Sequence, residues 1–489
     1  MQRLALTASL LMLLPCPTPA AENPWRSKVP AAVERAYATR TAGAFADALD
    51  VAWRADDWER GLELARRAQR DLADEPALRS RVARALYRAG LVIEAETLAD
   101  KLDSSDDAIA LRMRLGIELA RGRHDEARRW AERLAGRAAP DGEDIYQLYS
   151  AAFVLRQSER LADLARKAER SIDPNNGYPD ILVSDAVQGL SAFHDATGPQ
   201  PLNQVVAHGS APLTPLVMIG LPAVQIEING RGPYRLVLDT GGSIMLSLDE
   251  TVAEELGLKS IAPASVRGVS GRQETGQVLF DQVTIGSIRC RRVMGRTFDV
   301  RSALFNSADG IIGTGIFADS RITLDFVDGR LTVSPSTDEP GPGVRTDARI
   351  IGDAKVMALV ELGGQPAVAM LDSGADAIAL APSKLERLFP DRHIPRYDPG
   401  LALGVGGDDT PQIAIGPGVE MKLGGRTFPN YGGLGLDVLD TLISPVLGVQ
   451  TNILLGMPLF RETRRVTIDF PRAQLWIEWA EHARGAEQR

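Results

Sequence analysis

The sequence is poor in the residues on which metalloproteins and many hydrolases depend. It contains 2 Cys and 5 His among 489 residues. Two cysteines cannot build a disulfide framework or a four-cysteine zinc site. The chain also lacks a Gly-x-Ser-x-Gly nucleophile elbow, a His-Glu-x-x-His metal helix and a glycine-rich phosphate loop. We therefore predict no metal site and no cofactor.

An excess of positive charge is absent as well. Asp and Glu total 64 against 55 Lys and Arg, which gives a net charge of -9. Nucleic acids and anionic membranes are bound through basic surfaces. The composition therefore argues against a general binder of either kind, and we expect no nucleic-acid partner.

Residues 1–21 have the composition of a secretory signal peptide. Arg3 precedes an apolar run from Leu4 to Leu14, and small residues follow it. This run is too short to span a hydrocarbon core of ~30 Å, whereas a signal peptide needs no longer one. We predict that the segment is removed and that the mature chain is exported to the periplasm or beyond it. No later segment is apolar enough to predict a membrane span.

Residues 28–170 are predicted to form a helical repeat array. This stretch is rich in Ala, Arg, Leu and Glu and nearly free of internal Pro and Gly, as helices require. Four segments align with a period of about 34 residues. One column of the alignment holds Ala65, Ala99, Ala131 and Ala165. A small residue at a fixed position allows paired helices to approach closely.

The period and the alanine column resemble the tetratricopeptide family. That resemblance implies an array that binds peptides or partner proteins, and a helical spacer that only packs against the next domain remains the alternative. Residues 171–211 lose the helical period and collect Pro, Gly, Asn and Ser. We predict a linker there.

From residue 212 onward the pattern is typical of β-strands. Short runs rich in Val, Ile and Leu are separated by Gly and Pro. We predict one β lobe over 212–335, a linker over 336–345, a second lobe over 346–480 and a tail over 481–489. Together with the helical array this is a multidomain chain, all-α and then all-β.

Two short motifs divide the β region. Leu-Val-Leu-Asp-Thr-Gly-Gly-Ser covers residues 236–243, and Ala-Met-Leu-Asp-Ser-Gly-Ala-Asp covers residues 369–376. A lone Asp-Thr-Gly is best interpreted as a turn, because Asp and Gly favour turns in any protein. Two copies at the end of apolar runs require another explanation.

The surroundings of the two motifs match as well. Each motif is followed by a glycine patch and then by an apolar run that ends in glycine. The patches begin at Gly268 and Gly404 and end at Gly271 and Gly407, and the apolar runs end at Gly313 and Gly456. Matched features in the same order indicate a tandem duplication.

The paired motifs resemble the aspartic proteases, and residues 224–258 resemble the opening of the bacterial retropepsin-like group. The resemblance covers the β region and implies two pseudo-symmetric β-barrel lobes that meet at a cleft. It assigns the catalytic pair to Asp239 and Asp372. Two carboxyls held close together cannot both ionise, so they share one proton. The ionised one then activates water and the protonated one polarises the substrate carbonyl.

The same resemblance implies roles for the neighbouring residues. Hydroxyls that bond across to the opposite turn, and glycines that allow close backbone approach, support the active-site loops: Thr240, Gly241, Ser373, Gly374, Gly313 and Gly456. Substrate contacts and the two flaps over the cleft are assigned to Ser243, Asp376, Gly268, Gly271, Gly404 and Gly407. Such flaps exclude water and clamp an extended peptide as an added strand.

We therefore predict an exported aspartic endopeptidase that cleaves protein or peptide substrates. Both halves contain the motif, so the lobes are expected to pair within one chain and the enzyme to be a monomer. A periplasmic scaffold whose repeats bind a partner, and whose β lobes are catalytically silent, is the alternative.

Overall fold

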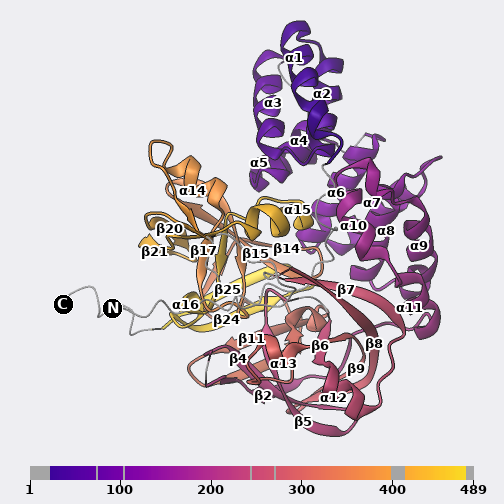
Figure 1. Ribbon diagram of the computed structural model, residues 1–489, viewed down its shortest axis with the longest axis vertical. Coiled ribbons are helices and arrows are strands. Elements are labelled where there is room, and N and C mark those ends of the chain that lie inside the picture. The colour runs from indigo at the N-terminus through magenta and orange to yellow at the C-terminus, as the bar shows by residue number, and fades with distance from the viewer. Residues whose placement is uncertain are drawn as a thin grey trace. The chain divides into compact units, whose positions relative to one another are not determined.

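The computed structural model describes residues 23–72, 75–102, 105–217, 219–242, 245–268, 271–397 and 413–480. They form two compact units (Figure 1). The helical unit contains the described residues up to 195 and a short segment, 442–450, and the β unit contains 196–441 and 451–480. The predicted signal peptide and tail lie outside the described residues. Within those residues, no helix is long and apolar enough to cross a membrane.

The helical unit consists of consecutive helices joined by short turns, of which α2–α3, α4–α5, α6–α7 and α8–α9 pack as hairpins. Its α-helices are α1 (Val29–Thr39), α2 (Ala42–Arg54), α3 (Trp58–Asp71), α4 (Arg79–Arg88), α5 (Val92–Ala99), α6 (Ala108–Ala120), α7 (His124–Ala135), α8 (Gly142–Val154), α9 (Ser158–Ser171), α10 (Asp180–Val187), α11 (Leu190–Thr197) and α15 (Ser444–Leu447). Short 3-10 turns are η1 (Arg26–Lys28), η2 (Pro76–Leu78), η3 (Asp100–Leu102) and η4 (Pro174–Asn176), and η6 (Leu439–Ile443) is a π-helix that precedes α15.

The four hairpins share their packing and their turn geometry. The aligned alanines, Ala65, Ala99, Ala131 and Ala165, are all buried. At the same place in each turn, one residue adopts a left-handed backbone: Asp56, Gly90, Gly122 and Arg156, with φ of 52°, 80°, 69° and 60°. The alignment made from the sequence thus corresponds to equivalent positions in space. Membership of the tetratricopeptide family stays a prediction.

The segment 171–211, expected to be a linker, contains regular structure. Helices α10 and α11 and strand β1 (Gln204–Ala207) lie within it, and strand β2 (Gly209–Pro212) begins in it. Each of these helices has 8 residues, which is too short to show a clear helical period in the sequence. Val187 and Leu190 pack into the core around α8 and α9. The glycines and prolines fall between these elements.

The first β lobe is built around strand β5 (Arg231–Asp239), which forms a hairpin with β4 (Pro222–Ile228). Asn229 and Gly230 make the turn with φ of 51° and 77°, as the Asn-Gly pair predicts. The sheet order is β1-β9-β6-β10-β5-β4-β8-β7, with β3 beside β4. The remaining elements are β3 (Thr214–Pro215), β6 (Leu246–Asp249), α12 (Glu250–Leu256), β7 (Ala262–Gly268), β8 (Gly271–Ile285), β9 (Ile288–Phe298), α13 (Val300–Ala303), β10 (Gly310–Gly313) and η5 (Thr314–Phe317).

The second lobe repeats this plan around β16 (Gln365–Leu371). Its sheet order is β18-β19-β22-β17-β23-β16-β15-β20-β21, with β14 beside β15. The remaining elements are β14 (Ala348–Ile351), β15 (Lys355–Leu362), β17 (Ile378–Leu380), α14 (Pro382–Leu388), β18 (Arg396–Tyr397), β19 (Ile413–Ile415), β20 (Val419–Leu423), β21 (Arg426–Tyr431), β22 (Leu434–Leu436), β23 (Ile453–Leu455) and α16 (Met457–Phe460). In both lobes the aspartate strand lies parallel to a short apolar strand, β10 or β23.

A third sheet joins the two lobes. Its order is β13-β25-β24-β11-β12-β2, with β11 (Ser320–Asp325), β12 (Arg330–Pro335), β13 (Val344–Thr346), β24 (Thr463–Asp469) and β25 (Gln474–Trp479). Strands β11 and β24 pair antiparallel about Thr323 and Thr467. Around that centre, Arg321 pairs with Asp469 at 3.0 Å and Arg465 with Asp325 at 2.5 Å. This reciprocal pairing is the local two-fold symmetry that a duplicated sequence predicts.

The predicted fold class is confirmed. A helical region comes first, and a β region of two similar lobes follows it. Buried apolar side chains from both lobes form one continuous core, so the lobes have a fixed arrangement within the β unit.

Candidate active site

Asp239 lies at the end of strand β5, whose preceding residues are buried. Leu236, Val237 and Leu238 are fully buried, and they pair in parallel with β10. The register sets Gly313 directly beside Asp239. The apolar strand therefore ends by delivering a carboxyl group into the interior.

Asp372 is placed in the same way. Strand β16 pairs in parallel with β23, which sets Leu371 beside Leu455, and the Asp372 amide donates to the Leu455 carbonyl at 3.0 Å. Gly456 comes next, and a Cβ there would lie 2.0 Å from the Ala377 carbonyl oxygen. Such a contact is far too close for any side chain, so this turn requires glycine.

The turns after the two aspartates are locked together by four reciprocal hydrogen bonds. The Thr240 hydroxyl donates to the Leu371 carbonyl at 3.0 Å and accepts from the Ser373 amide at 2.9 Å. The Ser373 hydroxyl donates to the Leu238 carbonyl at 2.7 Å and accepts from the Thr240 amide at 3.0 Å. All of these groups are buried, so water does not compete with them. Each lobe thereby fixes the aspartate of the other.

Each turn glycine lies against the carboxyl group of the opposite lobe. A Cβ on Gly241 would lie 2.4 Å from Cγ of Asp372, and a Cβ on Gly374 would lie 2.6 Å from Cγ of Asp239. The two carboxyl groups are thus held face to face across the junction of the lobes. Gly374 also donates its amide hydrogen to Asp372 at 2.9 Å.

The two carboxyls titrate as one unit because they are buried and adjacent. Burial raises the pKa of Asp239 to about 6, while its hydrogen bond with Asp372, Lys355 and the amides of Gly241 and Gly242 act in the opposite direction. Burial also raises the pKa of Asp372 well above its usual range, and the charge of Asp239 raises it further. The pair therefore retains one proton at a pH where an isolated aspartate has lost its own.

One charged residue beside the pair was not predicted from the sequence. The Lys355 ammonium is buried and donates to the Gly242 carbonyl at 2.6 Å. It also lies 2.9 Å from a carboxylate oxygen of Asp353. A lysine at the start of a strand has no local signal that distinguishes it from a surface lysine.

The predicted substrate and flap residues are only partly described. Strands β7 and β8 form a hairpin whose register pairs Gly268 with Gly271, so this glycine patch does lie at a hairpin tip. Asp376 is half-buried, a few residues after Asp372. Ser243, Gly404 and Gly407 lie outside the described residues. The structure thus brings together the two aspartates and their supporting turns, and it does not test the substrate assignments.

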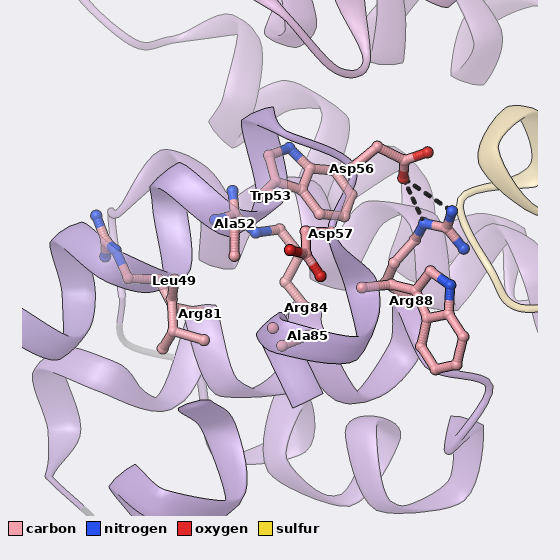
Figure 2. Close-up of a pocket in the computed structure, with 11 residues that line it drawn as sticks. Leu49, Ala52, Trp53, Asp56, Asp57, Arg81, Arg84, Ala85 and Arg88 are labelled. Carbon is pink, nitrogen blue, oxygen red and sulfur yellow. Dashed lines mark hydrogen bonds and ion pairs between the residues drawn. The ribbon is translucent and has the colours of Figure 1, made fainter. Parts of the chain in front are cut away.

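The helical unit has a polar cluster of its own at one end of α2 and α4. Figure 2 shows Arg88 directed at Asp56, and two guanidinium nitrogens donate to its Oδ1 at 3.1 and 2.8 Å. Beside it, the Arg84 guanidinium stacks 4.6 Å above the Trp53 ring. These residues line a small, partly open pocket on the helical unit.

This cluster contacts the short segment 442–450 of the same chain. The Gln450 amide donates to the Arg88 carbonyl at 2.8 Å, and the Tyr178 hydroxyl donates to the Pro445 carbonyl at 2.9 Å. Tyr178 is buried with its ring edge against Trp53. Part of the helical surface is thus occupied by the chain itself.

Comparison with known proteins gives one family match and a distant solved structure. The sequence model of the aspartyl protease family matches residues 224–316 and 358–459, and so includes both aspartates. A solved structure, the retropepsin-like aspartic protease from Rickettsia conorii, is 14% identical and covers 28% of this chain and 98% of its own, with a TM-score of 0.20. No curated protein sequence matches. The family match supports an aspartic protease.

Proposed function

We propose that this protein is an exported aspartic endopeptidase that hydrolyses peptide bonds through water activated by Asp239 and Asp372. The observation that supports it best is the reciprocal locking of two duplicated turns, which holds two buried carboxyls against each other. A purely structural pair of turns has no need to bury two carboxyl groups face to face, because their burial opposes ionisation.

The reaction follows from a pair that holds one proton. The ionised carboxyl removes a proton from a water molecule, whose oxygen attacks the carbonyl carbon of the substrate. The protonated carboxyl gives its proton to the carbonyl oxygen, so a tetrahedral diol forms. One diol hydroxyl then returns its proton to the second carboxyl, the first carboxyl protonates the leaving nitrogen, and the C–N bond breaks. The pair ends as it began, with one proton.

The substrate in this proposal is an extended peptide segment of a protein. The β7–β8 hairpin and the glycine patch of the second half act as flaps, which add the peptide as a strand and exclude water. The helical repeats bind the substrate protein or a regulatory partner on surface not used by segment 442–450. The chain acts as a monomer, in the periplasm or outside the cell.

Single substitutions at the pair provide the direct experiment. Asp239→Asn and Asp372→Asn should each abolish cleavage of an unfolded protein substrate between acidic and neutral pH, because either change removes the shared proton and charge. Asp281→Asn, the same change at an exposed position of β8, should retain wild-type activity. Cleavage that persists in both dyad variants would refute the assignment.

The silent scaffold is distinguished by binding without turnover. A peptide with a hydroxyl-bearing isostere at the scissile position resembles the tetrahedral intermediate, so an active pair should bind it at least about 100-fold more tightly than the parent peptide. Equal affinity for the two, together with no cleavage by the wild-type protein, would favour the scaffold.

A further inference from the structure

Lys355 is the most deeply buried lysine described in the chain, at 1% exposure. It begins strand β15 of the second lobe, just after a tight turn in which Gly352 and Ala354 have left-handed φ of 58° and 72°. Burial of an ammonium group is costly unless partners replace its water. The residue must therefore be explained by what it contacts.

Its contacts cross from the second lobe to the active-site turn of the first. The ammonium donates to the carbonyl of Gly242, the residue next but one after Thr240, at 2.6 Å. A Cβ on Gly242 would lie 3.1 Å from Cγ of Asp239, so this peptide lies against the catalytic carboxyl. Lys355 thus fixes the Gly242 peptide, which packs against the Asp239 carboxyl group.

The charges around Lys355 balance only when the aspartate pair holds one negative charge. The groups that face it are Asp353 at 2.9 Å, Asp239 and Asp372, and Arg296 of β9 lies near enough to Asp353 to interact with it. Lys355 thus faces both Asp353 and the pair, and Arg296 is a second cation near Asp353. A pair with one proton has one negative charge, which brings this buried cluster to neutrality.

The position of the first lobe that is equivalent to Lys355 holds no cation. The matching positions at the start of β4 are Leu221 and Pro222, both apolar. The two aspartates are therefore related by pseudo-symmetry in their turns but not in their electrostatic surroundings. A requirement for stability alone would not select one buried lysine pointing at one turn, since an apolar residue serves in the other lobe.

We infer that Lys355 is a positioning residue of the active site, which fixes the Gly242 peptide and holds a single negative charge on the aspartate pair. This inference rests on the proposed function. A nearby cation favours the charged form of a carboxyl and so lowers its pKa. Lys355 therefore lowers the pH range in which the aspartate pair holds one proton.

The experiment compares pH profiles of kcat/KM. Lys355→Met removes the cation, so both limbs of the profile should move to higher pH by about 0.5 to 1 unit. Lys355→Arg keeps the charge and should restore the wild-type profile. Lys384→Met is the matched control. Lys384 is also a buried lysine of the second lobe, but its ammonium is bonded to Gln365 and Pro366, and this variant should leave the profile unchanged.

Asp353→Asn gives the opposite sign. The Asp353 side chain is 22% exposed, so the substitution should be tolerated more easily than one at Lys355. It also removes the negative charge that partly neutralises Lys355. The profile should then move to lower pH. Profiles of Lys355→Met and Asp353→Asn that coincide with that of the wild type would overturn the inference, and so would shifts of both in the same direction.

A second measurement separates this inference from the proposed function. The raised pKa values of the pair mean that the folded state binds more protons than the unfolded state above the usual aspartate pKa. Stability is therefore lost as pH rises through the folded pKa of about 6. Lys355→Met should move this pH-dependent loss upward and Asp353→Asn should move it downward. If the wild type cleaves nothing, the peptidase proposal fails. If the pH midpoint of the stability loss is the same in the variants as in the wild type, the role of Lys355 is contradicted.

Discussion

At the scale of single residues, the site depends on two glycines that lack a Cβ atom. A Cβ atom on Gly241 or Gly374 would lie only 2.4 or 2.6 Å from Cγ of Asp372 or Asp239, respectively. Neither glycine has the left-handed backbone that usually explains the residue. The requirement is therefore one of space at the junction, and it exists only because another lobe is there.

Gly241→Ala should reduce kcat/KM by about 100-fold or more, because the methyl group displaces the opposite carboxyl by a fraction of its own size. The matched control is Gly43→Ala, where an added Cβ meets nothing within 4 Å and the residue lies inside α2. That variant should keep full activity and gain slightly in stability. Activity assays and thermal melts of the two variants check this, and an active Gly241→Ala enzyme would contradict the geometry.

At the scale of elements, the segment 442–450 behaves as part of the helical unit although it lies in the sequence of the second lobe. Arg88 and Tyr178 hold its backbone, and Arg88 also pairs with Asp56. Thr451 and Asn452 follow directly, and the Asn452 side chain accepts from the amide of Val368 on β16. The helical repeats thus hold a segment that continues into the strand pair of Asp372.

Arg88→Ala should loosen this segment. It leaves Asp56 without its main partner and removes the side chain that supports Gln450, so we expect a loss of about 2 to 4 kcal/mol in unfolding free energy. Amide hydrogen exchange at Gln450 should become faster, because the Gln450 amide bonds to this residue's carbonyl. Arg35→Ala, at an exposed ion pair of α1, serves as the control and should change neither quantity measurably. Unchanged exchange at Gln450 in Arg88→Ala would show that the segment is held by other contacts.

At the scale of the whole molecule, the two aspartates meet within one chain. Strands β11 and β24 pair in the middle of the shared sheet, and buried side chains of both lobes form a single core. We therefore expect the two lobes of one chain to stay paired with each other.

A mixture of the Asp239→Asn and Asp372→Asn proteins should consequently remain inactive. If lobes from different chains could pair, the mixture would contain some sites with both aspartates and would recover up to about a quarter of the activity. Peptidase assays of the mixture after long incubation, with sedimentation to establish the mass, check this. Recovered activity would indicate exchange between chains.

Much of this protein could be predicted from local sequence. The hairpin period, the Asn-Gly turn and the two Asp-[Thr/Ser]-Gly motifs are patterns within a few residues, and each corresponds to an element of the structure. The helices α10 and α11 were missed because they are too short to show a period.

The sequence by itself determined which residues meet in the candidate site, because duplicated turns with Asp239 and Asp372 imply symmetric placement. Only the tertiary structure decided their electrostatic environment. Lys355 and Gly242 are 113 residues apart, and Arg88 and Gln450 are 362 apart. The local sequence does not indicate such pairs. A charge can be buried only where partners replace its water, and those partners come together only when the chain folds.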